Sequence, residues 1–124
     1  MEIKKITHLI KYKMELDNKW IAKYDKAIDV IKSKMKDQLP KFKLVKENSE
    51  RKTSYYFLVY NFNNITIELG GERGAIDFLL KIDDKSVNLY KEDKRFDELK
   101  TASENNFIIF IGLLKEDLEK NKLI

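Results

Sequence analysis

The chain has 124 residues, which is enough for one domain and too few for two of ordinary size. Hydrophobic residues make up 43% of it and charged residues 37%, so it can bury a core beneath a strongly charged surface. It contains no cysteine, which excludes disulfides, thiolate chemistry and Cys-based zinc sites.

The net charge of +4 is unevenly distributed. Residues 1–52 carry 15 Lys and Arg against 8 Asp and Glu, whereas the remaining 72 residues carry 10 against 13. An excess of positive charge in one part of the chain steers an anionic partner toward that part. A solvated helix that happens to be rich in Lys would produce the same excess without any such role. The longest apolar run, residues 107–114, is too short to span a membrane, and Lys interrupts the N-terminal residues throughout. We therefore expect a single cytoplasmic domain over residues 1–124, without a membrane partner.

The N-terminal half contains the clearest helical pattern. In the preceding residues 3–16, apolar and charged residues alternate, which favours a strand. Their apolar positions also approximate a helical stripe, so a helix stays the alternative. Asp17 and Asn18 are suitable N-cap residues, and Pro40 ends the pattern that follows them. Apolar residues at three- and four-residue spacing predict a long amphipathic helix between these points: Trp20, Ile21, Tyr24, Ala27, Ile28, Ile31, Met35 and Leu39.

The densest aromatic and β-branched run, Thr53 to Phe62, is apolar at both sets of alternate positions. This pattern is typical of a strand that is buried on both faces, so we predict that it is the central strand of a sheet. The other strands are expected to be one-sided and to follow each other as an antiparallel meander of about five strands. The segments assigned to strands are Phe42 to Lys46, Ile65 to Leu69, Ala75 to Asp83 and Val87 to Lys91. The loops between them are residues 46–52 (KENSERK), Asn63–Asn64, residues 70–74 (GGERG) and Asp84–Lys85.

The C-terminal part from Asp97 is predicted to be helical, with Thr101 and Glu104 as a candidate capping box. Its apolar stripe is Phe107, Phe110, Ile111, Leu114 and Leu118, widened by Ile108, Ile109 and Leu113. A helix this apolar should be buried from two sides, and a homodimer through it is one way to achieve that. Close approach of another backbone would explain Gly112. The fold class is therefore α+β, with a meander sheet, a long helix in the N-terminal half and a C-terminal helix.

The sequence shows no catalytic constellation, cofactor motif or metal-ligand spacing. The single histidine, His8, lies among Ile and Tyr and is best interpreted as structural. GGERG lacks the Lys-Ser/Thr of a phosphate-binding loop and precedes a strand, so no helix N-terminus is there to hold an anion. A two-carboxylate site assembled from distant strands stays an alternative for the acidic pairs. We expect no enzyme activity, no cofactor and no metal.

What the pattern indicates instead is a binding surface. If helices cover only one face of the sheet, an aromatic strip of the Thr53–Phe62 strand is left exposed among charged residues. Either Tyr56, Tyr60 and Phe62 or their opposites, Tyr55 and Phe57, would then be accessible. The candidate binding residues are Tyr56, Tyr60, Phe62, Glu72, Arg73, Lys41, Lys43, Lys46 and Arg51.

Three functions compete. The first is a non-catalytic binding protein that docks on a macromolecular partner, a protein in our leading hypothesis, and inhibits or sequesters it, as toxin-immunity or phage anti-defence proteins do. The second is a nucleic-acid-binding module in which sheet aromatics stack on bases and the Lys-rich N-terminal half contacts phosphates. The third is a pocket for a small anionic ligand between the long helix and the sheet, lined by Trp20 and Tyr24.

Overall fold

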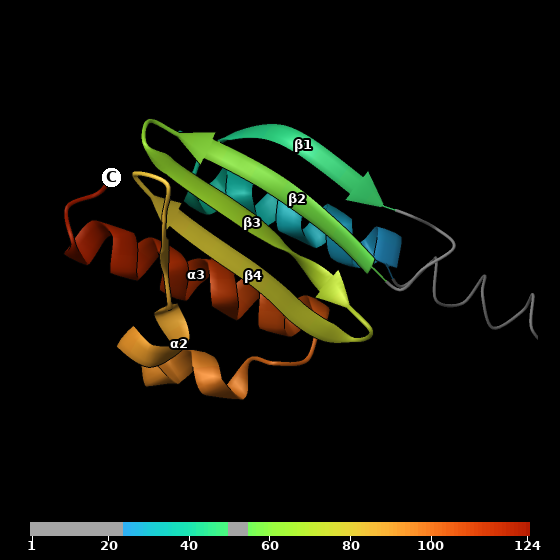
Figure 1. Cartoon of the computed structure of the whole chain (residues 1–124). Helices are drawn as coiled ribbons and strands as arrows, with labels where there is room; N and C mark the ends of the chain where they lie inside the picture. The colour runs from blue at the N-terminus through green and yellow to red at the C-terminus, as the bar shows by residue number, and fades with distance from the viewer. Residues whose placement is uncertain (1–23, 50–54) are drawn as a thin grey trace, which may run out of the picture.

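The computed structural model describes residues 24–49 and 55–124, which form an α+β fold (Figure 1). A five-stranded antiparallel sheet has the strand order β1-β2-β3-β4-β5, so every strand pairs with its neighbour in sequence. The described elements are α1 (residues 24–38), β1 (Lys43–Ser49), β2 (Tyr55–Phe62), β3 (Ile65–Glu72), β4 (Ala75–Ile82), β5 (Lys85–Val87), α2 (Leu89–Glu92), the 3-10 helix η1 (Lys94–Glu98) and α3 (Glu104–Lys120). This confirms the predicted fold class. The expectations for residues 3–16, for Trp20 and Ile21 and for Arg51 lie outside the described residues.

Three two-residue turns connect β2 to β5, and each contains left-handed backbone. Asn63 has a φ of 52°, as expected for an Asn-Asn turn. The central residues of the next two turns both have positive φ, which matches the right-handed twist of the hairpins: Arg73 (50°) and Gly74 (81°), then Asp83 (53°) and Asp84 (62°). The GGERG turn is therefore shorter than predicted, because Gly70 and Gly71 belong to β3.

The two glycines of β3 are required by close packing of β2. A Cβ on Gly70 would overlap the carbonyl oxygen of Tyr56 and lie 2.7 Å from the Cα of Phe57. A Cβ on Gly71 would lie 2.7 Å from the hydroxyl oxygen of Tyr56, whose side chain is buried. Glycine at these positions lets β2 and β3 keep a continuous register from Tyr55–Glu72 to Phe62–Ile65.

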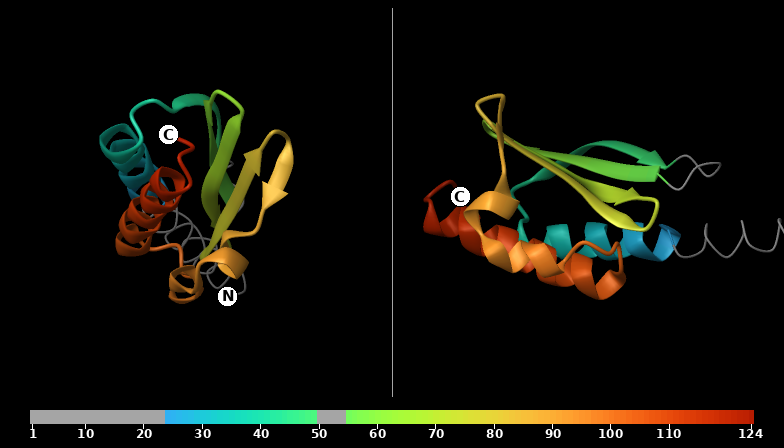
Figure 2. Two further views of the ribbon diagram at one scale, coloured as in Figure 1. Left: turned by 90° about the vertical axis from the view of Figure 1, so that its left-hand side faces the viewer. Right: turned by 60° about the horizontal axis from the view of Figure 1, so that its bottom comes forward.

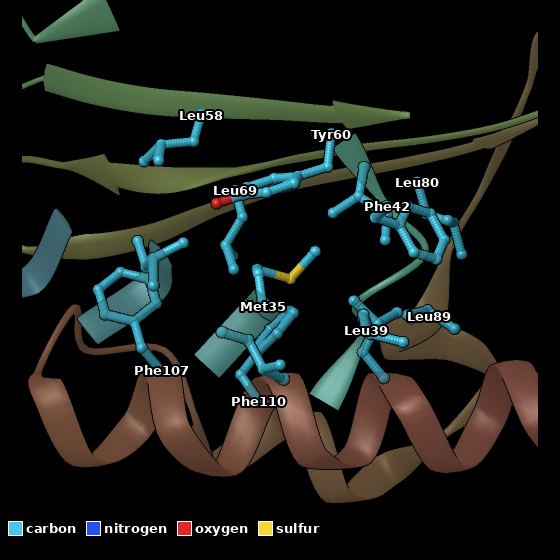
Figure 3. Packing of buried hydrophobic residues seen from close by; sticks show 14 of the residues in the cluster. Met35, Leu39, Phe42, Leu58, Tyr60, Leu69, Leu80, Leu89, Phe107 and Phe110 are labelled. Carbon is cyan, nitrogen blue, oxygen red and sulfur yellow. The ribbon is translucent and has the colours of Figure 1, made fainter. Parts of the chain in front are cut away.

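Both long helices, α1 and α3, pack side by side on the same face of the sheet (Figures 1 and 2). Alternate residues of the strands point into this layer, and Figure 3 shows Leu69 directed toward Met35 and Phe110, with Leu58 beside it on the same side of the sheet. Tyr56, Leu58 and Tyr60 of β2 are buried here, at 2%, 0% and 5% exposure. No described helix lies on the opposite face, where Tyr55, Phe57 and Val59 of β2 are half-buried, so for the described residues the expectation that neither face of this strand meets water is wrong. In strand order the centre of the sheet is β3.

Helix α1 has the amphipathic pattern that the sequence predicts. Its buried residues follow three- and four-residue spacing: Ala27, Ile28, Ile31, Met35 and Leu39 beyond its last turn. The amide of Leu39 still donates to the carbonyl of Met35 at 2.8 Å, and Pro40 then ends the helix. Lys32 on its flank pairs with Glu47 of β1 at 2.9 Å, which ties the helix to the edge strand.

Helix α3 buries the predicted stripe and leaves the other side open. Phe107, Phe110, Ile111, Leu114 and Leu118 are all buried. The N-cap is Ser103, whose hydroxyl accepts from the amide of Asn106 at 3.2 Å, so the prediction of a Thr101–Glu104 capping box is wrong. Nothing lies within 4 Å of a Cβ placed on Gly112, so the expected close backbone approach is also wrong among the described residues. Ile108 and Ile109 are exposed at 38% and 49%.

Two further boundaries differ from prediction. Strand β1 continues to Ser49, well into the expected KENSERK loop, because it pairs with β2 as far as Ser49–Tyr56 after a bulge near Val45. The expected strand Val87 to Lys91 is instead the end of β5 followed by α2, since Asn88 caps a short helix by accepting from the amide of Lys91. Among the described helices, none combines the length and apolarity needed to cross a membrane.

The environments of two glycines predict opposite effects of the same substitution. Gly70→Ala should destabilise the protein by about 3 kcal/mol, because the new methyl group overlaps the backbone of β2. Gly112→Ala should stabilise it by up to about 1 kcal/mol, because the methyl group meets nothing and alanine favours the helix. Urea unfolding of both variants checks this, and equal effects of the two substitutions would contradict the assigned packing.

Candidate functional site

The face of the sheet opposite the helices, which we call the open face, carries a mixed apolar and charged surface. Its composition follows from the alternation of β2, β3 and β4 and from their register. The residues of the open face are Tyr55, Phe57, Val59, Asn61, Thr66, Glu68, Gly70, Glu72, Ala75, Asp77, Leu79 and Lys81, joined at the β1 edge by Lys43 and Lys46. The four large apolar members, Tyr55, Phe57, Val59 and Leu79, are half-buried on the side away from the core.

Two aromatic rings form the centre of the apolar strip. The ring centroids of Tyr55 and Phe57 are 5.3 Å apart with an interplanar angle of 51°. The ammonium nitrogen of Lys46 lies 5.6 Å from the centroid of Phe57, within the range of a cation–π contact. The rings are therefore held in place by each other and by the edge strand, and one of them already accepts a cation.

Three carboxylates, which we call the acidic corner, gather at one end of the open face: Glu68, Glu72 and Asp77. The pKa of Tyr55 is raised, mainly by burial. The charges of Asp77, Glu68 and Glu72 and a hydrogen bond to Asp77 raise it further. Since Tyr55 is on β2 and Asp77 on β4, its side chain reaches across β3. Gly70 is the residue of β3 that pairs with Asp77, and it presents no side chain to block that path.

The other end of the open face is basic. Lys81 pairs with Thr66, and Lys43 pairs with Asn61, so both lysines lie in the row farthest from Tyr55. The side-chain nitrogen Nδ2 of Asn61 donates to the carbonyl oxygen of Ile65 at 3.1 Å and to Oγ1 of Thr66 at 3.3 Å. These hydrogen bonds hold the polar side chains of this row in place. The open face is therefore polarised, with carboxylates at one end and ammonium groups at the other.

The aromatic residues predicted for the site lie on the opposite side of the sheet. The ring of Tyr56 contacts that of Tyr24 at 5.2 Å, and burial raises the pKa of Tyr56 and, to about 12, that of Tyr60. Phe62 is half-buried against Phe42, at 5.5 Å between centroids. These residues form the core and its margin, so a partner cannot reach Tyr56 and Tyr60 in the folded protein. Two apolar faces on one strand do not reveal which one the helices cover.

The charged residues predicted for the binding site lie in different parts of the structure. Lys43 and Lys46 belong to β1 and border the open face, and Glu72 is part of the acidic corner. Arg73 is exposed in the β3–β4 turn, and the ammonium of Lys41 lies 5.9 Å from the ring of Phe62 on the helix side. Sequence reasoning did not select Glu68 and Asp77, although their alternation with apolar residues placed them opposite the core.

A second polar cluster joins η1 to the end of α3. Arg95 pairs with Asp93 at 2.8 Å, with Glu116 at 3.2 Å and with Asp117 at 3.6 Å. The hydrogen bond from Arg95 strongly lowers the pKa of Asp93, whereas burial and the neighbouring Asp93 raise the pKa of Asp117. Oδ2 of Asp117 is buried and has no hydrogen-bond partner among the described residues.

A hollow of about 480 Å³ adjoins this cluster, between β4, β5, α2 and the end of α3. Its walls include Leu80, Leu89 and Leu114, with Asp93 and Asp117 among its polar residues. Among the described residues, no group of three or more His, Cys, Asp or Glu side chains is arranged to hold a metal ion. The cluster serves to attach η1 to α3.

Comparison with known proteins adds no assignment: no protein-family model, no curated protein and no solved structure matches the chain.

The raised pKa of Asp117 predicts that Asp117→Asn increases the stability of the fold in a pH-dependent way. Because the folded pKa of Asp117 is raised, its contribution to stability is present below the unfolded pKa and is lost as the pH rises through the folded value. An Asn amide can donate to Asp93 without titrating, and it removes a negative charge from the C-terminal end of α3. The variant should therefore be about 1 kcal/mol more stable than the wild type at pH 7, with the difference vanishing near pH 3.

Thermal unfolding of the variant and the wild type across this pH range checks the prediction. Asp93→Asn is the matched comparison: the folded pKa of Asp93 is lowered, so its contribution is present at neutral pH and lost in acid. It should therefore destabilise the protein at pH 7. A loss of stability in Asp117→Asn at neutral pH would show that the carboxylate is charged and paired.

The two faces of β2 predict unequal costs for neighbouring substitutions. Leu58→Ala should cost about 3 kcal/mol, because Leu58 is fully buried beneath the helices. Phe57→Ala should cost about 1 kcal/mol, because the ring is half-buried on the open face, where Tyr55 of the same strand and Lys46 of β1 contact it. Urea unfolding measures both, and an equal cost would mean that the open face is packed as tightly as the core.

Proposed function

We propose that the protein is a non-catalytic binding module that docks on a protein partner through the open face and thereby inhibits or sequesters it. The observation that supports this most is the strip of Tyr55, Phe57, Val59 and Leu79 on the face that no described helix covers. Apolar side chains flanked by charges are the usual composition of a protein–protein interface. A small module that docks on its partner prevents other molecules from binding the surface that it covers.

The acidic corner favours a protein partner over nucleic acid. Bases would have to stack on Tyr55 and Phe57, next to Glu68 and Asp77, whose charges repel phosphates. The lysines of the open face lie at its other end and at the β1 edge. The surface therefore matches a partner that places cations at the acidic corner, which the phosphates of nucleic acid do not supply.

A small-ligand pocket beneath the long helix is not supported by the described part of that interface. Leu58 and Leu69 of the sheet and Met35 of α1 fill it, each with at most 1% exposure (Figure 3). A cytoplasmic setting, in keeping with the lack of cysteine, forms part of the proposal. The proposed mode of action is the one that toxin-immunity and phage anti-defence inhibitors use.

A site-specific photocrosslinker tests the docking face. A benzoylphenylalanine at Phe57 should crosslink a host protein, whereas the same group at Asn105, exposed on α3, should not. Protease and nuclease treatment of the product identifies the class of partner. Crosslinking from Asn105 alone would place the interface on the helix layer, and a nuclease-sensitive product from Phe57 would replace the proposal with the nucleic-acid alternative.

A further inference from the structure

The arrangement of side chains on the open face restricts what can occupy it. The strand register places successive rows across the sheet, from the acidic end to the basic end. These rows are Tyr55–Glu72–Ala75, Phe57–Gly70–Asp77, Val59–Glu68–Leu79 and Asn61–Thr66–Lys81. The aromatic rings thus share the first two rows with two carboxylates, and the third carboxylate follows in the next row.

Little in the described structure neutralises the acidic corner. Asp77 accepts from the Tyr55 hydroxyl, a neutral donor, and its charge also contributes to the raised pKa of Tyr90 on α2. Lys46, which borders the open face on β1, has its ammonium nitrogen 5.6 Å from the centroid of the Phe57 ring. A cation placed at this end would meet three carboxylates and the electron-rich aromatic rings of Tyr55 and Phe57.

We propose that the occupant of the open face is a protein segment whose sheet-facing side chains are first basic and then small, which places a Lys or Arg at the acidic corner. An extended segment suits the surface, because residues on one side of a strand are spaced like the rows of the sheet. Its small side chains rest on Val59 and Leu79. This inference rests on the proposed function and adds the chemistry of the partner.

The probe is the synthetic peptide Arg-Thr-Arg-Thr-Ala-Thr-Ala, which in an extended conformation presents its Arg and Ala side chains on one side. It is titrated into the ¹⁵N-labelled full chain and followed by NMR. Amide shifts should concentrate at Tyr55, Phe57 and Asp77, and the affinity should fall as salt is added. The same peptide with Glu in place of Arg and a single-stranded oligo-dT serve as probes of opposite charge and of another class. Neither should shift these amides.

Two variants with equal changes in net charge distinguish binding at the acidic corner from the general attraction between the basic peptide and the protein's net charge. The first combines Glu68→Gln, Glu72→Gln and Asp77→Asn, in which the new amide can still accept from the Tyr55 hydroxyl. The second combines Asp25→Asn, Asp29→Asn and Glu98→Gln, all exposed residues outside the open face. The first should weaken binding about tenfold, as three surface charge pairs of ordinary strength allow, and the second should change it less than about twofold.

The inference is overturned if the two triple variants lose affinity equally, if oligo-dT shifts the open-face amides, or if the wild type self-associates through this face in sedimentation. A crosslinked host protein whose contact segment is acidic would overturn it while leaving the proposed docking function intact. Failure of the Phe57 crosslinker, by contrast, would remove the docking function itself.

Discussion

The packing of one side of the sheet against two helices is the constraint on which the other features depend. Leu58 and Leu69 meet Met35 and Phe110 in a single apolar layer, and this layer contains most of the large buried side chains. Burial of this kind is the dominant favourable term in folding. Because α1 and α3 both contribute to it from one side and no described helix covers the other, the outward side chains of the strands form the polarised open face.

Much of the fold could be predicted from local patterns. The helical spacing in α1, the stripe of α3 and the alternation of β4 are each visible within a few residues, and Asn63 marks a turn by its own conformational preference. Errors arose where two local signals compete. Thr101 and Ser103 are both suitable N-caps, and only Ser103 has the hydroxyl that reaches the amide of Asn106.

The site was less predictable because it depends on contacts between distant segments. Tyr55 reaches Asp77 only because β2, β3 and β4 are in a particular register with Gly70 between them. Arg95 likewise meets Asp117 only when η1 lies against the end of α3. A strand that is apolar on both faces, such as β2, carries no local mark of which face the helices cover, so the assignment of Tyr56 and Tyr60 to a surface could not be corrected from sequence.

The three two-residue turns also influence the order in which the chain folds. Every strand pairs with the one beside it in sequence, so the sheet has low contact order and closes only short loops as it forms. The meeting of α1 and α3 is a long-range step, because these helices lie on opposite sides of the meander in sequence and side by side in space. Until α3 has been synthesised, the inner side of the sheet has only α1 to cover it. Folding to completion must therefore await the C-terminal residues.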